Sequence, residues 1–103
     1  MDIEFSKKQR ASIRAAFGNA VRAKRLAIGI SQEELAFRSG LHRTYVGSVE
    51  RGERNISIEN IYLLAKSLNC TPAELVLDFP NPTPISKNRS NTSKMYIKKE
   101  QKL

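Results

Sequence analysis

Helix start and stop signals recur at short intervals in this sequence, and they restrict the chain to short helices joined by tight turns. Residues 31–34 (SQEE) have the spacing of a capping box, in which serine and glutamate each satisfy a backbone amide at the start of a helix. Residues 71–74 (TPAE) repeat the box, with proline at the first helical position. Glycines at positions 29, 40 and 52 each follow a helical segment, where a left-handed residue ends a helix.

These signals predict an all-α fold of five helices. The helices are expected at about 12–28 (with Ser6 as an alternative start), 32–39, 43–51, 58–68 and 72–78. Apolar residues recur within them at spacings of three and four, so each helix has one narrow face to bury and the five together can enclose one small core. The expected core residues are Ile13, Phe17, Ala20, Val21, Ile28, Leu35, Ala36, Val46, Val49, Ile58, Ile61, Leu64, Ala65, Leu68, Leu75 and Val76.

The composition changes after Phe79. Residues 80–103 hold three closely spaced prolines and then mostly polar and basic residues, so we expect a flexible basic tail after one domain at 1–79. The net charge of +8 favours a polyanionic partner, nucleic acid first and an acidic membrane surface second. However, the tail carries +5 of this charge and residues 1–79 only +3. Charge alone therefore does not identify the folded part as a nucleic-acid-binding domain.

Several classes of protein are disfavoured by what the sequence lacks. A single cysteine, Cys70, excludes an internal disulfide, and we expect it to act as a small buried apolar group. No signal peptide or span of about 18 apolar residues is visible, so a cytoplasmic protein without a membrane partner is expected. The single histidine, His42, is expected to cap a helix or lie at the surface. With no catalytic pair, metal cluster or phosphate-binding loop, we expect no enzyme activity, no cofactor and no metal.

Residues 32–51 have the pattern of a helix-turn-helix. Ala36 is small where two helices must cross closely, and Gly40, four residues later, permits a sharp turn. Leu41, Val46 and Val49 supply the buried positions beyond the turn. Small, glycine and aliphatic residues seldom coincide at these offsets by chance.

The second of these helices is expected to present an outward polar stripe. Its members are Arg43, Thr44, Gly47, Ser48 and Arg51. Arginine can pair with two acceptors of guanine, and the two hydroxyls can hydrogen-bond base edges or phosphate. A mid-helix glycine costs about 1 kcal/mol against alanine, so we predict that Gly47 lets the helix sit deep in the major groove. The alternative is a solvated face with a tolerated glycine.

The stretch LHRTYVGSVERGERN resembles the helix-turn-helix of the lambdoid phage repressor and Xre superfamily, over about residues 14–79. It is most similar to the controller proteins of bacterial restriction–modification systems, which carry Arg-Thr-Tyr at the start of the recognition helix and Arg-Asn shortly after it. The resemblance implies a lambda-repressor-like domain that binds double-stranded DNA. With Arg51 from the polar stripe, the DNA-binding residues that follow are Gln32, Arg43, Thr44, Tyr45, Ser48, Arg51, Arg54 and Asn55.

Several of these positions have a second interpretation. The resemblance places Gln32 at a phosphate and Tyr45 against the DNA backbone, but Gln32 also suits any helix start and Tyr45 could pack on the rim of the core. Arg51 and Arg54 could be ordinary surface charges.

The resemblance also implies a buried structural pair. Arg25 and Glu50 match an arginine and a glutamate that tie the first helix to the third beneath the DNA-binding face. Loss of one partner of such a pair, if it is buried, costs about 3–5 kcal/mol.

One recognition helix reads only a few base pairs, so a palindromic operator and a homodimer are expected, with the two recognition helices about 34 Å apart. The predicted isologous interface consists of Tyr62, Leu63, Leu77 and Phe79, which lie off the main core stripe. The alternative is that these residues complete the core of the monomer.

The leading prediction is a sequence-specific transcription regulator. By resemblance it would control a restriction endonuclease gene, first as an activator and at higher occupancy as a repressor, with RNA polymerase as a further partner. The alternatives are a prophage repressor, an autoregulating antitoxin, or an RNA-binding or protein-adaptor module that uses the basic tail.

Overall fold

The computed structural model describes residues 5–82, and the fold of these residues is all-α, as the sequence predicts. The helices are α1 (Lys7–Ala27), α2 (Gln32–Ser39), α3 (Arg43–Glu50), α4 (Ile58–Ser67) and α5 (Pro72–Val76). Nearly all of the expected tail at 80–103 lies outside the described residues. No helix between residues 5 and 82 has the length and apolar character needed to cross a membrane.

Local capping explains where the helices begin. Ser31, Ser57 and Thr71 each accept a hydrogen bond from the backbone amide three residues later, as the spacing predicts. At residues 31–34 only the serine half of the predicted capping box forms, because the Glu34 carboxylate accepts from Arg38 Nε at 3.0 Å. α1 begins at the earlier of its two expected starts. The Ser6 hydroxyl accepts from the Gln9 amide at 3.1 Å, and the Gln9 side chain accepts from the Ser6 amide at 2.8 Å. This capping box adds more than one turn before Ser12, the other expected start.

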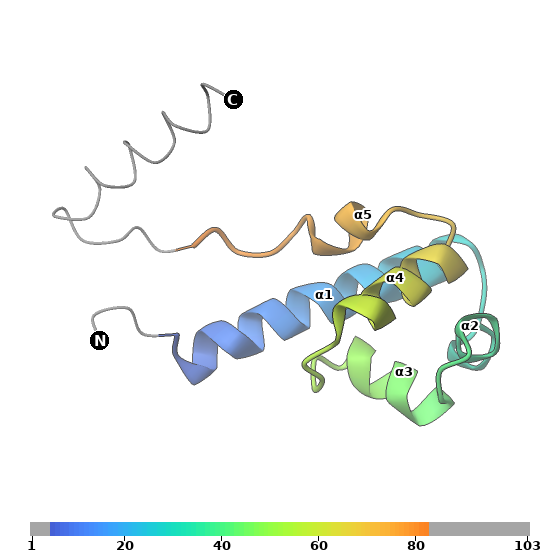
Figure 1. Ribbon diagram of the computed structural model, residues 1–103, viewed down its shortest axis with the longest axis horizontal. Coiled ribbons are helices and arrows are strands. Elements are labelled where there is room, and N and C mark those ends of the chain that lie inside the picture. The colour runs from blue at the N-terminus through green and yellow to red at the C-terminus, as the bar shows by residue number, and fades with distance from the viewer. Residues whose placement is uncertain (1–4, 83–103) are drawn as a thin grey trace, which may run out of the picture.

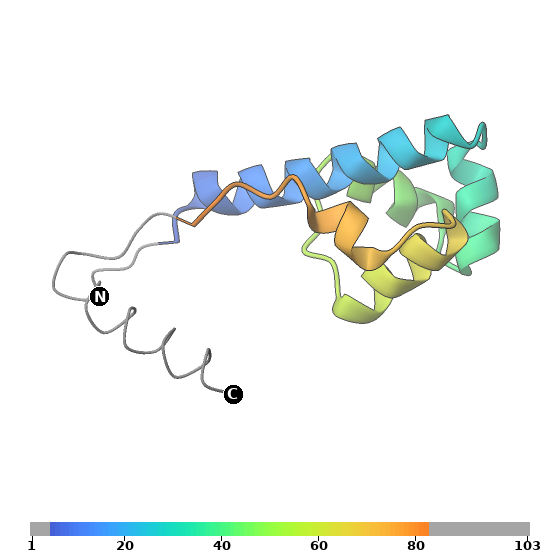
Figure 2. The same ribbon diagram turned by 90° about the horizontal axis from the view of Figure 1, so that it is seen from above.

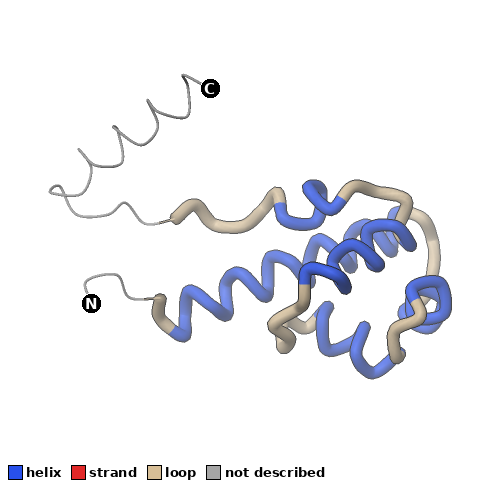
Figure 3. Tube along the Cα trace, viewed as in Figure 1, coloured by secondary structure: helices blue, strands red, loops and turns tan. Residues whose placement is uncertain are grey.

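α1 runs the length of the molecule, and the shorter helices gather beside its C-terminal half (Figures 1 and 2). α1 packs on α3 and α5, α2 packs on α3 and α4, and α4 packs on α5. The loops between the helices are short, and the segment after α5 runs back along α1 (Figures 1 and 3). This arrangement leaves one side of the α2–α3 pair facing outward.

The core contains one stripe from each helix. Its buried residues are Phe17, Val21, Leu35, Ala36, Val46, Val49, Leu64, Ala65, Leu68 and Leu75. Two residues expected in the core are instead exposed, Ile28 at 39% and Ile58 at 82%. Ile28 caps the end of α1 and Ile58 is the first residue of α4, so both project beyond the neighbouring helices. Cys70 is half-buried against the core, and burial raises the pKa of its thiol.

α1 and the end of α3 approach each other backbone to backbone at Gly18. A Cβ atom at this position would overlap the carbonyl oxygen of Val49 and would lie 2.7 Å from that of Glu50. Only glycine fits this contact, because real Cβ atoms do not approach other heavy atoms within 3.0 Å. The close approach fixes the end of α3, and with it the whole helix-turn-helix, against α1.

Candidate nucleic-acid interface

α2 and α3 form the helix-turn-helix, and a tight turn at Gly40 joins them. Gly40 has a φ of 74°, a left-handed conformation that glycine adopts without strain, and its amide donates to the Ala36 carbonyl at 2.9 Å. His42 then caps α3, because its Nδ1 atom accepts from the Thr44 amide at 3.1 Å. Since Val46 and Val49 fill the core side of α3, its opposite face is turned outward.

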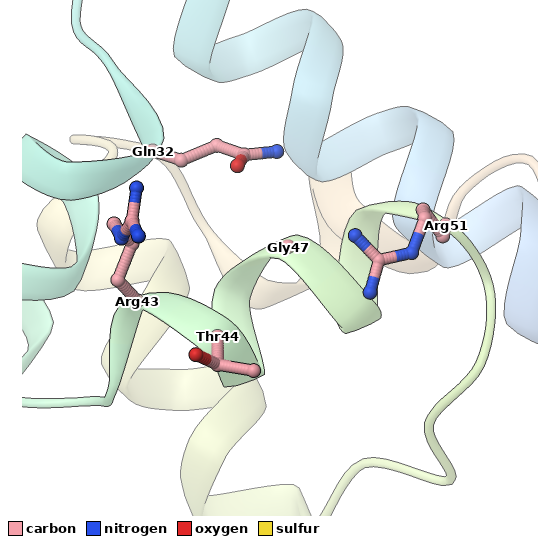
Figure 4. Close-up of a pocket in the computed structure, with 5 residues that line it drawn as sticks. All are labelled: Gln32, Arg43, Thr44, Gly47 and Arg51. Atoms are coloured by element: carbon pink, nitrogen blue, oxygen red, sulfur yellow. The ribbon is translucent and has the colours of Figure 1, made fainter.

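The outward face of α3 meets the start of α2 in a shallow, open pocket of about 250 Å³ (Figure 4). Arg43 and Arg51 stand on either side of Gly47, and Gln32 reaches over it from α2 (Figure 4). Arg43 and Thr44 are exposed, and the four ion pairs formed within residues 5–82 do not involve Arg43. The Arg43 guanidinium is therefore available to a ligand from solution.

Gly47 makes room for polar groups above the helix. A Cβ atom there would lie 3.2 Å from Arg51 Nη1 and 3.5 Å from Gln32 Oε1. The missing side chain therefore leaves space that these two side chains occupy in the free protein, so Gly47 itself is buried and not exposed as the predicted stripe had it. How deeply α3 enters a groove stays a prediction.

A buried chain of hydrogen bonds fixes Gln32. Arg25 Nε donates to Glu50 Oε2 at 2.6 Å and Arg25 Nη2 donates to Glu50 Oε1 at 2.9 Å, so α1 and α3 are joined by a bidentate pair. Arg25 Nη1 also donates to the Ile30 carbonyl at 2.9 Å. Gln32 Nε2 donates to the same Glu50 Oε1 at 3.0 Å. The sequence predicts the pair, but nothing in the sequence pattern indicates that it also orients Gln32.

The Glu50 carboxylate is ionised despite its burial. Burial by itself would raise the pKa of Glu50, but the hydrogen bonds from Arg25 and Gln32 outweigh it and hold the pKa below its usual value. The same contact raises the pKa of Arg25. Glu50 therefore accepts from both partners at neutral pH, and the Gln32 amide oxygen is left facing the outward pocket.

Ser48 does not lie on the exposed stripe, and that part of the sequence prediction is wrong. Only 4% of the surface of Ser48 is exposed to solvent. The Ser48 hydroxyl donates to the Tyr45 carbonyl at 2.7 Å and accepts from Arg54 Nε at 2.9 Å. Arg54, in the loop after α3, covers Ser48 and prevents it from facing the outer surface.

Tyr45 is half-buried at the rim of the core, and two groups hold its side chain. Asn60 Nδ2 donates to the Tyr45 hydroxyl at 3.1 Å, and the Arg54 guanidinium lies 5.4 Å from the centre of the Tyr45 ring. This distance suits a cation–π contact. Tyr45 thus packs on the rim of the core, as its second interpretation predicts, and its contact with the DNA backbone stays a prediction.

The loop between α3 and α4 carries the remaining candidate residues. Arg51 Nε donates to Glu53 at 2.9 Å, and this contact raises the pKa of Arg51 and lowers that of Glu53. Asn55 is exposed. Arg14 Nε from α1 donates to the Gly52 carbonyl at 3.3 Å and so ties this loop to α1.

The four candidate interface residues differ in exposure. Tyr62 and Leu77 are 61% and 77% exposed, whereas Leu63 and Phe79 are half-buried and Phe79 packs against the core. The exposed Ile58 lies one helical turn before Tyr62 on α4.

Among the residues at 5–82, no group of three or more His, Cys, Asp or Glu side chains is gathered as a metal site would require.

Residues 21–75 match the helix-turn-helix family. The chain belongs to this family. Its matched region contains α2, α3 and α4 in full, together with Arg25 and Glu50. The family is one of DNA-binding transcription regulators and not of enzymes.

The relatives of this helix-turn-helix chain include controller proteins of restriction–modification systems, so the predicted resemblance is confirmed. The chain is 49% identical over 69 residues to the control protein C.BamHI of Bacillus amyloliquefaciens, which covers 66% of this chain and 84% of that protein. The solved structure of the restriction–modification controller protein C.AhdI from Aeromonas hydrophila is 55% identical, with a TM-score of 0.59. The match covers 60% of this chain and 94% of the C.AhdI chain. The structure of the controller protein C.Esp1396I as a tetramer in complex with its natural 35-base-pair operator is 29% identical, with a TM-score of 0.57. The match covers 64% of this chain and 96% of that chain.

Proposed function

We propose that this protein is a sequence-specific transcription regulator that binds a palindromic DNA operator as a homodimer and acts as the controller of a restriction–modification system. The observation that carries the proposal is the outward face of α3, where the exposed Arg43 and Thr44 stand beside Gly47 and the fixed amide of Gln32. The similarity to C.BamHI and C.AhdI supports the same function.

The chemistry of this face suits a major groove. The Arg43 guanidinium can donate two parallel hydrogen bonds to O6 and N7 of guanine, and Thr44 offers a hydroxyl for a base edge and a methyl for thymine. Gln32 lies at the first position of α2, where the free amides of a helix start favour a phosphate. These groups would separate base readout by α3 from backbone contact by α2.

Contacts to the DNA backbone are assigned to a second group of residues. Tyr45, near the start of α3, carries Arg54 beside its ring, and Asn55 follows Arg54 in the loop after α3, while Arg51 lies at the end of α3. Because Arg51 already pairs with Glu53, a phosphate that binds Arg51 would either share its guanidinium with the Glu53 carboxylate or displace that carboxylate. Ser48, which is buried, is left out of the DNA-contacting set.

A homodimer would bury apolar residues that the monomer leaves exposed on α4 and after α5. The most exposed of these are Ile58, Tyr62 and Leu77, and the half-buried Leu63 and Phe79 complete the proposed interface. A two-fold dimer matches a palindromic operator, because each half-site then meets the same recognition helix. Occupancy of tandem operators would allow activation, through contact with RNA polymerase in the cytoplasm, and repression at higher protein concentration.

The proposal is tested on the DNA upstream of the protein's own gene. We expect the protein to protect a palindromic duplex there and to bind it at least about 10³-fold more tightly than random DNA. Arg43→Ala should weaken binding to that duplex by about 1–3 kcal/mol and relax the base preference at one position of each half-site.

Lys8→Ala is the matched control, because it removes one charge from an exposed residue in the first turn of α1, outside α2, α3 and the α4 face assigned to the dimer. It should change specific and random binding little and equally. If the unaltered protein prefers no duplex over random DNA, the regulator proposal is overturned. If Arg43→Ala weakens both kinds of binding equally, Arg43 contacts phosphate and does not read a base.

A further inference from the structure

We propose that Ser48 and Asn60 are positioning residues, which hold Arg54 and Tyr45 in a geometry ready for DNA before DNA binds. The inference rests on the proposed function, since it assigns DNA contact to Arg54 and Tyr45. It adds a role for two residues that the outward face does not display, one buried in α3 and one on α4.

The Ser48 hydroxyl is committed to two partners, and their directions fix the orientation of Arg54. Its one hydrogen is donated to the Tyr45 carbonyl at 2.7 Å, so the lone pairs of the oxygen are left to accept from Arg54 Nε at 2.9 Å. Nε is the inner nitrogen of the guanidinium. With Nε held, both terminal nitrogens keep their hydrogens for an incoming acceptor, and this is the fork that binds phosphate.

Asn60 acts on Tyr45 in a corresponding way. Its Nδ2 atom donates to the Tyr45 hydroxyl at 3.1 Å, so the phenol oxygen serves as the acceptor in this bond. The phenol hydrogen then points elsewhere and can be donated to a phosphate oxygen. Because Asn60 lies in the first turn of α4, the bond also ties the recognition helix to a helix outside the helix-turn-helix.

The two held side chains stabilise each other. The Arg54 guanidinium lies 5.4 Å from the centre of the Tyr45 ring, and the ring in turn packs against the core. A free arginine loses rotamer freedom when it binds a ligand. An arginine that is already held by a hydroxyl and by a ring has lost much of that freedom on folding. The entropy cost of ordering it on DNA binding is therefore smaller, and the affinity is higher.

The test is a double-mutant cycle with the duplex that is protected upstream of the protein's own gene. Ser48→Ala should weaken binding about five- to tenfold when Arg54 is present. In the Arg54→Ala background the same substitution should change binding less than twofold, because Ser48 acts through Arg54. Equal losses in both backgrounds would show a merely structural serine and overturn the inference.

Salt dependence supplies a second readout that a general loss of stability would not reproduce. Arg54→Ala should lower the slope of log affinity against log salt by about one, since one phosphate contact is lost. Ser48→Ala should keep the slope of the unaltered protein while binding more weakly, because the contact still forms from a less ordered arginine. A reduced slope for Ser48→Ala would contradict this account.

A second cycle does not depend on the buried serine tolerating change. Asn60→Ala and Tyr45→Phe should each weaken binding, and the double variant should bind about as well as Tyr45→Phe alone. Additive losses would overturn the role of Asn60. If the unaltered protein binds the duplex and Arg54→Ala binds it equally well, this inference fails and the regulator proposal stands. If the unaltered protein protects no duplex, both fail.

Discussion

Gly18→Ala should destabilise the protein through a contact between two helix backbones. The added methyl would overlap the Val49 carbonyl oxygen and would lie 2.7 Å from that of Glu50. Both clashing atoms belong to the last turn of α3, so no side chain can rotate away to relieve the contact. α1 and α3 must move apart, and the movement also strains the Arg25–Glu50 pair, which joins the same two helices.

Opposing effects set the size of the loss. Overpacking a close-packed site costs about 1–3 kcal/mol, and a rigid backbone contact belongs at the upper end of that range. Alanine returns about 1 kcal/mol, because it favours the helix over glycine. We therefore expect the free energy of unfolding to fall by about 2 kcal/mol, which lowers the Tm of a domain of this size by about 10 °C.

Thermal and urea unfolding followed by circular dichroism measure this loss, and Gly47→Ala is the matched control. Position 47 is also a mid-helix glycine, but its Cβ would meet the flexible Arg51 side chain at 3.2 Å. Gly47→Ala should therefore hold or raise the Tm while it weakens binding to the operator. A Gly18→Ala variant as stable as the unaltered protein would refute the close-packing argument.

Three further substitutions test charge and assembly. Glu50→Ala leaves Arg25 buried without its carboxylate, so urea unfolding should show a loss of about 3–5 kcal/mol; a loss below 1 kcal/mol would contradict burial of the pair. Glu74→Gln keeps the capping box but removes a charge whose pKa is lowered from 4.5 to about 2, chiefly by the hydrogen bond from Lys24. Because the folded pKa is the lower one, Glu74 stabilises the fold above about pH 4.5 and loses this effect as the pH falls through about 2. Thermal melts from pH 7 to 2 should therefore show the unaltered protein losing its advantage over Glu74→Gln in that window, and a constant difference would contradict the assignment. Leu77→Asp should convert a dimer to a monomer in analytical ultracentrifugation with an unchanged circular dichroism spectrum, whereas a persistent dimer would place the interface elsewhere.

Features that depend on neighbours in sequence could be predicted. A capping hydroxyl reaches an amide three residues away, and so Ser31, Ser57 and Thr71 mark their helices without help from the rest of the chain. The turn at Gly40 depends on a single φ angle. The sequence leaves two possible starts for α1, because Ser6 and Ser12 both precede helical sequence.

Features that depend on distant residues could not be predicted in the same way. The periodicity of α3 places Ser48 in its polar stripe, but the next loop folds back and lays Arg54 over it. Helical spacing also assigns Ile58 to the core, although the first turn of α4 has no neighbour to cover it.

Gly18 shows a contact that a single sequence does not reveal. A glycine within a helix is unfavourable by itself, but the sequence pattern does not indicate what this glycine contacts. Its partners are carbonyls more than thirty residues away, and periodicity carries no information about which helix they belong to.

The Glu50 carboxylate contributes both to stability, by pairing with Arg25, and to the outward face of α3, by holding Gln32. A redesign that exchanged the Arg25–Glu50 pair for hydrocarbon of equal volume could make the domain melt at a higher temperature, yet it would release Gln32, whose amide that carboxylate holds. Thermostable descendants of this protein would then be weaker repressors or activators, and screening for heat resistance alone would select against the trait a regulator needs.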